Sequence, residues 1–84
     1  MLYVISYDLN SPGQNYQPLW DAIAEIGGQR ILQSQWVVNR INTTATGLRD
    51  YLWKFMDAND ILLVNALGGT EWAGYNLIVD PNTL

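Results

Sequence analysis

The chain has 84 residues with no cysteine and no histidine, and its four Lys+Arg against eight Asp+Glu give a net charge of −4. This composition excludes disulfide bonds and thiolate or imidazole metal sites, and it disfavours extended duplex binding, which needs several cations to neutralise phosphates. A bound metal must therefore have oxygen ligands, which favours Mg²⁺, Mn²⁺ or Ca²⁺.

Length and hydrophobic content predict a single globular domain. Hydrophobic residues make up 49% of the chain and include four Trp and five Tyr. A chain of this size, residues 1–84, buries a limited core, so a dimer interface would add stability. No run approaches the length of a membrane span, and no basic segment with a cleavage site begins the chain. We therefore expect a soluble cytoplasmic domain with no membrane partner.

The first predicted element is a strand at Leu2–Tyr7, where β-branched and aromatic residues are concentrated. Its apolar content is typical of a central strand. Asp8 follows directly, at the point where the strand gives way to a loop. The loop Asn10–Asn15 contains Ser-Pro-Gly, a combination typical of turns.

A helical pattern begins near Tyr16, after this loop. Its apolar residues recur at i, i+4 and i+7 and are Leu19, Ile23 and Ile26. Gly27-Gly28 is expected to end the helix. The next two runs, Gln29–Leu32 and Gln35–Asn39, are separated by polar residues and predict a β-hairpin.

A second helix is predicted after Asn42-Thr43-Thr44, which supplies candidate N-caps. Its apolar positions, expected to join the core with those of the first helix, are Leu48, Leu52 and Phe55. Asp50 precedes Lys54 by four residues, which predicts an exposed ion pair. Asn59 is a candidate C-cap.

The apolar run Ile61–Leu67, ended by Gly68-Gly69, predicts a fourth strand. The resulting order of strand, helix, strand, strand, helix and strand is the α+β plan called ferredoxin-like. We expect an antiparallel four-stranded sheet with both helices on one face. The other face would need a cover, most simply a second copy of the chain.

The end of the chain predicts an additional strand or tail. Trp72 and Tyr75 supply large aromatic area, and Leu77–Val79 has strand propensity. Because these residues have no place left in a single-copy core, we expect them to contact the sheet of a partner subunit in a homodimer or higher oligomer. Trp72 and Tyr75 are therefore the predicted interface residues.

Four stretches of sequence carry a resemblance to a known family: VISYDLNSPGQNY, SQWVV, ANDILLV and EWAGY. The chain resembles the SinR-like proteins over most of its length. That family is a branch of the superfamily that contains the second CRISPR adaptation protein (Cas-two) and the VapD toxins. The resemblance implies a ferredoxin-like homodimer and Mg²⁺-dependent cleavage of RNA or DNA. It also implies that Asp8, which matches an aspartate at the end of the first strand, lies near the dimer axis.

Asp8 is thus the candidate catalytic and metal-binding residue. One carboxylate cannot hold a hard cation alone, but a two-fold axis would supply a second Asp8. Waters and a substrate phosphate would complete the coordination of Mg²⁺ or Mn²⁺. A simpler interpretation stays open, in which Asp8 accepts hydrogen bonds from N–H groups of its own loop.

Five further residues are candidate contacts to a ligand or a phosphate: Tyr7, Asn10, Ser11, Arg30 and Arg40. Asn10 and Ser11 precede a predicted helix N-terminus, where N–H groups can receive an anion. The two arginines supply positive charge, although they could equally pair with Glu25 or Asp21. Tyr7 could act as a donor or could simply fill the core.

Two functional classes follow. In the first, the protein is a metal-dependent endonuclease or endoribonuclease that uses Asp8 from both subunits. In the second, it is a non-catalytic homo-oligomer that captures a small nucleotide or a partner protein. The resemblance favours the first class, and the small number of cations favours the second.

Overall fold

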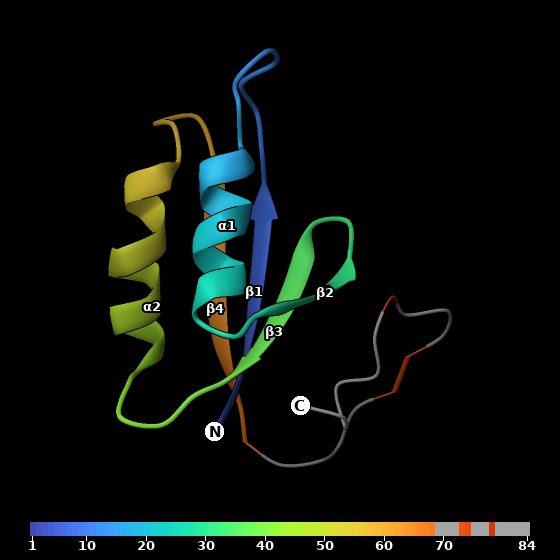
Figure 1. Ribbon diagram of the computed structural model, residues 1–84, viewed down its shortest axis with the longest axis vertical. Coiled ribbons are helices and arrows are strands. Elements are labelled where there is room, and N and C mark those ends of the chain that lie inside the picture. The colour runs from blue at the N-terminus through green and yellow to red at the C-terminus, as the bar shows by residue number, and fades with distance from the viewer. Residues whose placement is uncertain (69–72, 75–77, 79–84) are drawn as a thin grey trace.

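The computed structural model describes residues 1–68, 73, 74 and 78, which form a small α+β domain (Figure 1). Its elements are β1 (Leu2–Asp8), α1 (Gln17–Glu25), β2 (Gln29–Leu32), β3 (Gln35–Asn39), α2 (Ala45–Leu52), the short 3₁₀ helix η1 (Trp53–Phe55) and β4 (Ile61–Leu67). The bounds of β2, β3 and β4 are those expected from the sequence. Neither α-helix in this part of the chain has the length and apolar character needed to span a membrane.

The four strands form one antiparallel sheet in the order β2-β3-β1-β4. β1 is central, as predicted, and pairs with β3 on one side and β4 on the other. Ile5, in the middle of β1, lies opposite Trp36 of β3 and Val64 of β4. The end of β1 therefore lies beside the start of β4, where Asp8 is opposite Ile61.

In Figure 1 α1 lies in front of β1 and β4, and both helices share one core with the sheet. Alternate strand residues and one stripe of each helix are apolar, so they can face one another. The buried core residues are Tyr3, Ile5, Tyr7, Tyr16, Leu19, Ala22, Ile23, Trp36, Val38, Leu48 and Leu52. Ile26 and Phe55, also expected in the core, are partly buried and pack against it. The predicted helix stripes are therefore confirmed.

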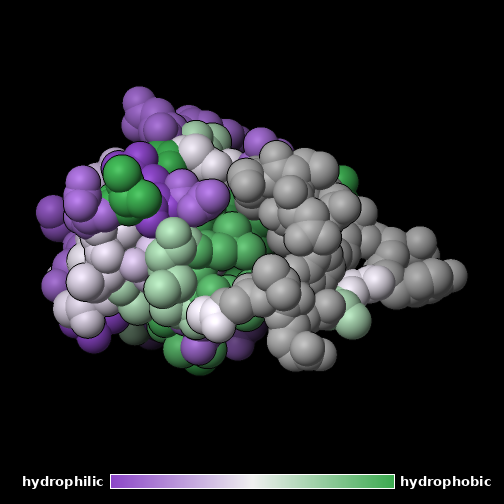
Figure 2. Space-filling model, turned by 90° about the horizontal axis from the view of Figure 1, so that it is seen from below, coloured by the Kyte–Doolittle hydropathy of each residue, from purple (hydrophilic) through white to green (hydrophobic). Residues whose placement is uncertain are grey.

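The opposite face of the sheet is unevenly covered. Val37 lies on that face because its neighbours Trp36 and Val38 join the helix-side core, and it is nevertheless buried. On β4, by contrast, Ile61 and Leu63 are 58% and 56% exposed. Figure 2 views the molecule from the end where the N-terminus lies, opposite to the start of β4, and shows apolar surface near the centre of that end. The expectation of a bare second face therefore holds for its β4 side.

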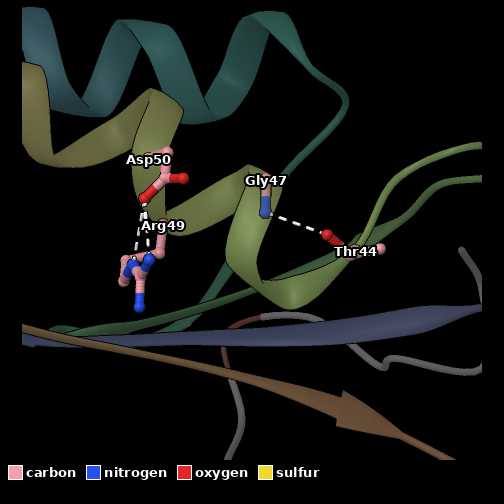
Figure 3. Close-up of polar contacts among 4 residues, drawn as sticks. All are labelled: Thr44, Gly47, Arg49 and Asp50. Atoms are coloured by element: carbon pink, nitrogen blue, oxygen red, sulfur yellow. Dashed lines mark hydrogen bonds and ion pairs between the residues drawn. The ribbon is translucent and has the colours of Figure 1, made fainter.

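The local sequence explains where each helix begins or ends. After α1, Gly27 adopts a φ of +92°, which side chains disfavour, and the Gly28 N–H donates to the Ile23 carbonyl at 2.8 Å. Before α2, the Thr44 hydroxyl accepts a hydrogen bond from the Gly47 N–H at 3.0 Å (Figure 3). The glycine stop and the threonine N-cap are both confirmed.

Two predictions about the end of α2 are wrong. The α-helix ends at Leu52 and the chain continues as η1, so Asn59 is not its C-cap. Lys54 lies within η1 and loses the helical spacing from Asp50. Asp50 pairs instead with Arg49, at 2.9 Å (Figure 3). Both of these side chains are exposed, so the pair adds little stability.

The predicted interface residues Trp72 and Tyr75 lie outside the described residues, as does most of Leu77–Val79. Within that segment Ile78 is described. Its N–H donates to the carbonyl of Ile31, in β2 of the same chain, at 3.0 Å.

Candidate functional site

Asp8 ends the central strand and is exposed. It faces away from the helices, together with Ser6, because Tyr7 and Ile5 point into the core. Among the residues that the structure describes, none donates a hydrogen bond to the Asp8 carboxylate or forms an ion pair with it. The carboxylate oxygens are thus not committed to the loop that follows.

Two shallow depressions adjoin Asp8. One, of about 230 Å³, is lined by Ser6, Tyr7, Asp8, Ser34, Ile61 and Leu63. The other, of about 260 Å³, is lined by Tyr7, Asp8, Leu9, Trp20, Gln33 and Ser34. Asp8 therefore lies at the edge of both depressions, one bounded by the exposed apolar start of β4 and the other by Trp20 of α1.

The donor chemistry at Asp8 suits a hard cation, because a carboxylate with free oxygens is a preferred ligand of Mg²⁺. In the part of the chain that the structure describes, however, there is no group of three or more Asp or Glu side chains placed to hold a metal. A cation at Asp8 would therefore need further oxygens from water, from substrate or from a second subunit.

Tyr7 has no hydrogen-bonding capacity left for a ligand. Its hydroxyl donates to the Gln33 carbonyl at 3.2 Å and accepts from Trp36 Nε1 at 3.0 Å and from Arg30 Nη2 at 3.2 Å. A phenol offers one donor and two acceptor lone pairs, so all its positions are used. Tyr7 thus joins the end of β1 to the β2–β3 hairpin.

Arg30 lies beside two aromatic rings. Its guanidinium carbon is 4.9 Å from the ring centroid of Trp20 and 4.8 Å from that of Trp36, so it makes cation–π contacts with both. Within the described residues it pairs with neither Glu25 nor Asp21, since the ion pair found there joins Arg49 to Asp50.

Arg40 is placed far from Asp8. It follows Asn39, which lies opposite Leu2 at the other end of β1. With a rise of about 3.3 Å per residue, the two ends of this strand are about 20 Å apart. Arg40 Nη1 donates to the carbonyl of Ile26 at 3.2 Å, next to the C-terminus of α1. The favourable interaction of a cation with a helix C-terminus explains this contact.

Asp60 joins the two loops at this end of the sheet. Its Oδ1 accepts hydrogen bonds from the Asn10 N–H at 2.8 Å and from the Tyr16 hydroxyl at 2.7 Å. Its Oδ2 accepts from the Asp57 N–H at 2.8 Å. The loop after β1 and the loop before β4 are therefore held together by one carboxylate.

Partial burial acts to raise the pKa of Asp60, but the hydrogen bonds from Asn10, Tyr16 and Asp57 outweigh it and hold the pKa below its ordinary value of 3.8. Burial, assisted by the Asp60 carboxylate, raises the pKa of the Tyr16 phenol above 10.0. The carboxylate is thus charged and the phenol neutral at pH 7, which suits the bond between them.

Asn10 and Ser11 take part in the same arrangement. The Asn10 side chain donates to the Asn59 carbonyl at 3.0 Å, and the Ser11 N–H donates to the Tyr16 hydroxyl at 3.3 Å. These donors, predicted to contact a phosphate, are engaged within the protein. An anion at this loop would have to displace them.

The structure thus brings Asp8, Tyr7 and Arg30 to one end of the sheet and separates Arg40 from them. The role of Asp60 was missed from the sequence. A signal was present, because an acid that precedes an apolar strand must meet the loop after β1 once those strands pair antiparallel. No protein-family model matches the chain.

Proposed function

We propose that the protein is a homodimer of the SinR-like and Cas-two type, in which two Asp8 carboxylates hold a divalent cation that promotes cleavage of a phosphodiester bond in nucleic acid. The observation that carries this proposal is the state of Asp8. It is an exposed carboxylate at the end of a central strand, beside two depressions, without a hydrogen bond to any described residue. Such a group is available to a cation.

The order of elements supports the ferredoxin-like part of the proposal. The chain runs β1-α1-β2-β3-α2-β4, and the sheet order is β2-β3-β1-β4. Both are the orders expected of the split βαβ plan. The resemblance of the SYD, SQW and EWAG stretches to SinR-like proteins favours the same plan.

The surface next to Asp8 supports a dimer. Ile61 lies opposite Asp8, Leu63 lies opposite Ser6, and both apolar side chains are more than half exposed. Apolar surface of this kind favours association. A two-fold contact made by this face would bring a second Asp8 to the junction.

The chemistry follows from these groups. A bound Mg²⁺ or Mn²⁺ supplies positive charge for a phosphoryl oxygen and a water of lowered pKa. In this proposal Asp8 holds the ion, and the hydroxyls of Ser6 and Ser34, which line the same depression, orient the phosphate. The net charge of −4 favours a short single strand over a duplex as substrate.

The test is cleavage of single-stranded RNA and DNA with Mg²⁺ or Mn²⁺. We expect Asp8→Asn to reduce the rate by at least about 100-fold, the scale set by losing one group that stabilises transition-state charge. Asp21→Asn is the matched control, because Asp21 is an exposed carboxylate on α1 that accepts a hydrogen bond from Gln17. Equal rates for the wild type and Asp8→Asn, or no cleavage by the wild type, would refute the proposal.

A second candidate function is the capture of a small nucleotide without catalysis. The net charge and the aromatic surroundings of Arg30 favour it. In that case calorimetry would detect binding of a nucleoside monophosphate by the wild type, and the bound nucleotide would be recovered unchanged.

A further inference from the structure

Arg30 makes fewer hydrogen bonds to the described residues than its guanidinium can donate. Its Nη2 donates to Tyr7, but its Nε is shielded from solvent and has no partner among the residues that the structure describes. Trp20 Nε1, in a ring that the guanidinium contacts, is likewise shielded and has no partner in the described part of the chain. Buried donors without acceptors are unfavourable and uncommon in folded proteins. The group that would satisfy both is an acceptor.

The charge of Arg30 is also uncompensated within the described residues. The ion pair found among them is elsewhere, between Arg49 and Asp50. Arg30 is partly buried, and a partly buried guanidinium is stabilised by a negative partner. The guanidinium contacts the rings of Trp20 and Trp36, and a negative partner would be bound by its N–H groups. An N–H edge of arginine matches the paired oxygens of an oxyanion.

We propose that Arg30 and Trp20 form a binding site for a phosphate group. The depression of about 260 Å³ that has Trp20 and Tyr7 in its wall is adjacent to Arg30, which is not in that wall but donates to Tyr7, and the Gln33-Ser34 turn also lines it. In this proposal the phosphate oxygens accept from Arg30 Nε and from Trp20 Nε1. The site takes the phosphate of a nucleotide or of a nucleic-acid strand.

Asp8 lines the same depression, and its charge opposes an anion there. A cation at Asp8 removes this repulsion, so phosphate and Mg²⁺ bind cooperatively. The role of this phosphate as part of a substrate rests on the proposed function. The binding of free phosphate at Arg30 does not require a metal, so the two proposals can fail separately.

The test is a titration of the full chain with inorganic phosphate at constant ionic strength, followed by tryptophan fluorescence. Trp53→Phe is the working background, because Trp53 is exposed and would dilute the signal from Trp20 and Trp36. We expect a saturable change that Arg30→Gln abolishes. Arg30→Lys keeps the charge without the planar fork and weakens binding by about tenfold or more. Adenosine monophosphate gives the same change as phosphate.

Two controls define the site. Arg40→Gln binds phosphate as the wild type does, because Arg40 lies at the other end of β1. Asp8→Asn binds phosphate about threefold more tightly at low ionic strength, because a like charge is removed, and it loses the enhancement by Mg²⁺. Far-UV circular dichroism establishes that each variant is folded.

Several results would overturn the site. One is a fluorescence change with phosphate that is no larger than the change with chloride. Another is phosphate binding by folded Arg30→Gln that equals binding by folded Arg30→Lys. A third is an affinity for acetate equal to the affinity for phosphate. Binding that appears only in Glu71→Gln or Asp80→Asn would show that an acid of this chain occupies the position instead. Phosphate binding that is retained in Asp8→Asn and lost in Arg30→Gln supports the site even if the protein cleaves no nucleic acid.

Discussion

At the scale of single residues, Asp8 and Asp60 occupy neighbouring strand ends but have different surroundings. Asp60 accepts three hydrogen bonds from two loops, whereas Asp8 is exposed and accepts none from the described residues. A carboxylate that is fully bonded stabilises the fold, and one that is free can bind a ligand. Asp60 is therefore the structural acid at this end of the sheet, and Asp8 is the candidate functional acid.

This difference predicts how stability depends on pH. The pKa of Asp60 is lowered in the folded protein, so its contribution is present above the ordinary value of 3.8 and is lost as the pH falls through the folded-state pKa. We expect Asp60→Asn to reduce the unfolding free energy at pH 7 by about 1 to 2 kcal/mol, and by less as the pH drops below 3.8. Urea unfolding of the wild type and Asp60→Asn at pH 7 and below pH 3.8 measures these differences in free energy.

Asp57→Asn is the control, because the Asp57 carboxylate is exposed and only its main-chain N–H takes part in the contact with Asp60. It should change stability by less than about 0.5 kcal/mol. If Asp60→Asn loses the same unfolding free energy at pH 7 as below pH 3.8, the stabilising role assigned to the charged Asp60 carboxylate is contradicted.

Residue roles were only partly predictable from the sequence. Asp8 could be placed at a strand end because an apolar run stops there. The contacts of Asp60 depend on β1 and β4 lying side by side, and those of Arg30 depend on α1 crossing the hairpin. Such contacts join residues 23 to 50 positions apart, and local pattern carries no information about them.

At the scale of elements, the period of the apolar residues determined the strands and helices well. β2, β3 and β4 have the predicted bounds because turn residues flank each run. The end of α2 was mispredicted because Phe55 follows Leu52 by three residues. In a 3₁₀ turn residues i and i+3 also share a side, so the stripe does not distinguish η1 from a continued α-helix.

The N-cap of α2 gives a test at this scale. Thr44→Ala removes the hydroxyl that accepts from the Gly47 N–H (Figure 3). We expect a loss of about 1 kcal/mol in unfolding free energy. Thr46→Ala is matched in chemistry and lies in the same helix without a capping bond, so it should be close to neutral or slightly stabilising. An equal loss in both variants would show that the cap contributes nothing specific.

At the scale of the whole molecule, the sheet has one face covered by helices and an opposite face whose β4 side is apolar and exposed. Ile61 and Leu63 lie there, in register with Asp8 and Ser6. A small domain with such a surface gains stability by association. The proposed dimer would therefore both complete the fold and duplicate Asp8.

We predict that Leu63→Lys shifts the protein toward monomer in sedimentation at micromolar concentration, because a buried lysine without a partner opposes the contact. Ile41→Lys is the matched control, since Ile41 is 78% exposed in the loop between β3 and α2. Its oligomeric state should equal that of the wild type. A wild type that sediments only as monomer would contradict the prediction. That Trp72 and Tyr75 join this interface stays a prediction, testable by Trp72→Ala in the same measurement.

The most direct measurement of the central claim is the stoichiometry of Mn²⁺ binding, by calorimetry or electron paramagnetic resonance. A cation held between two Asp8 carboxylates gives about one ion per two chains. Asp8→Asn should abolish this binding, and Leu63→Lys should weaken it together with the dimer. One ion per chain, or binding that Asp8→Asn leaves unchanged, would contradict a metal site shared across a two-fold axis.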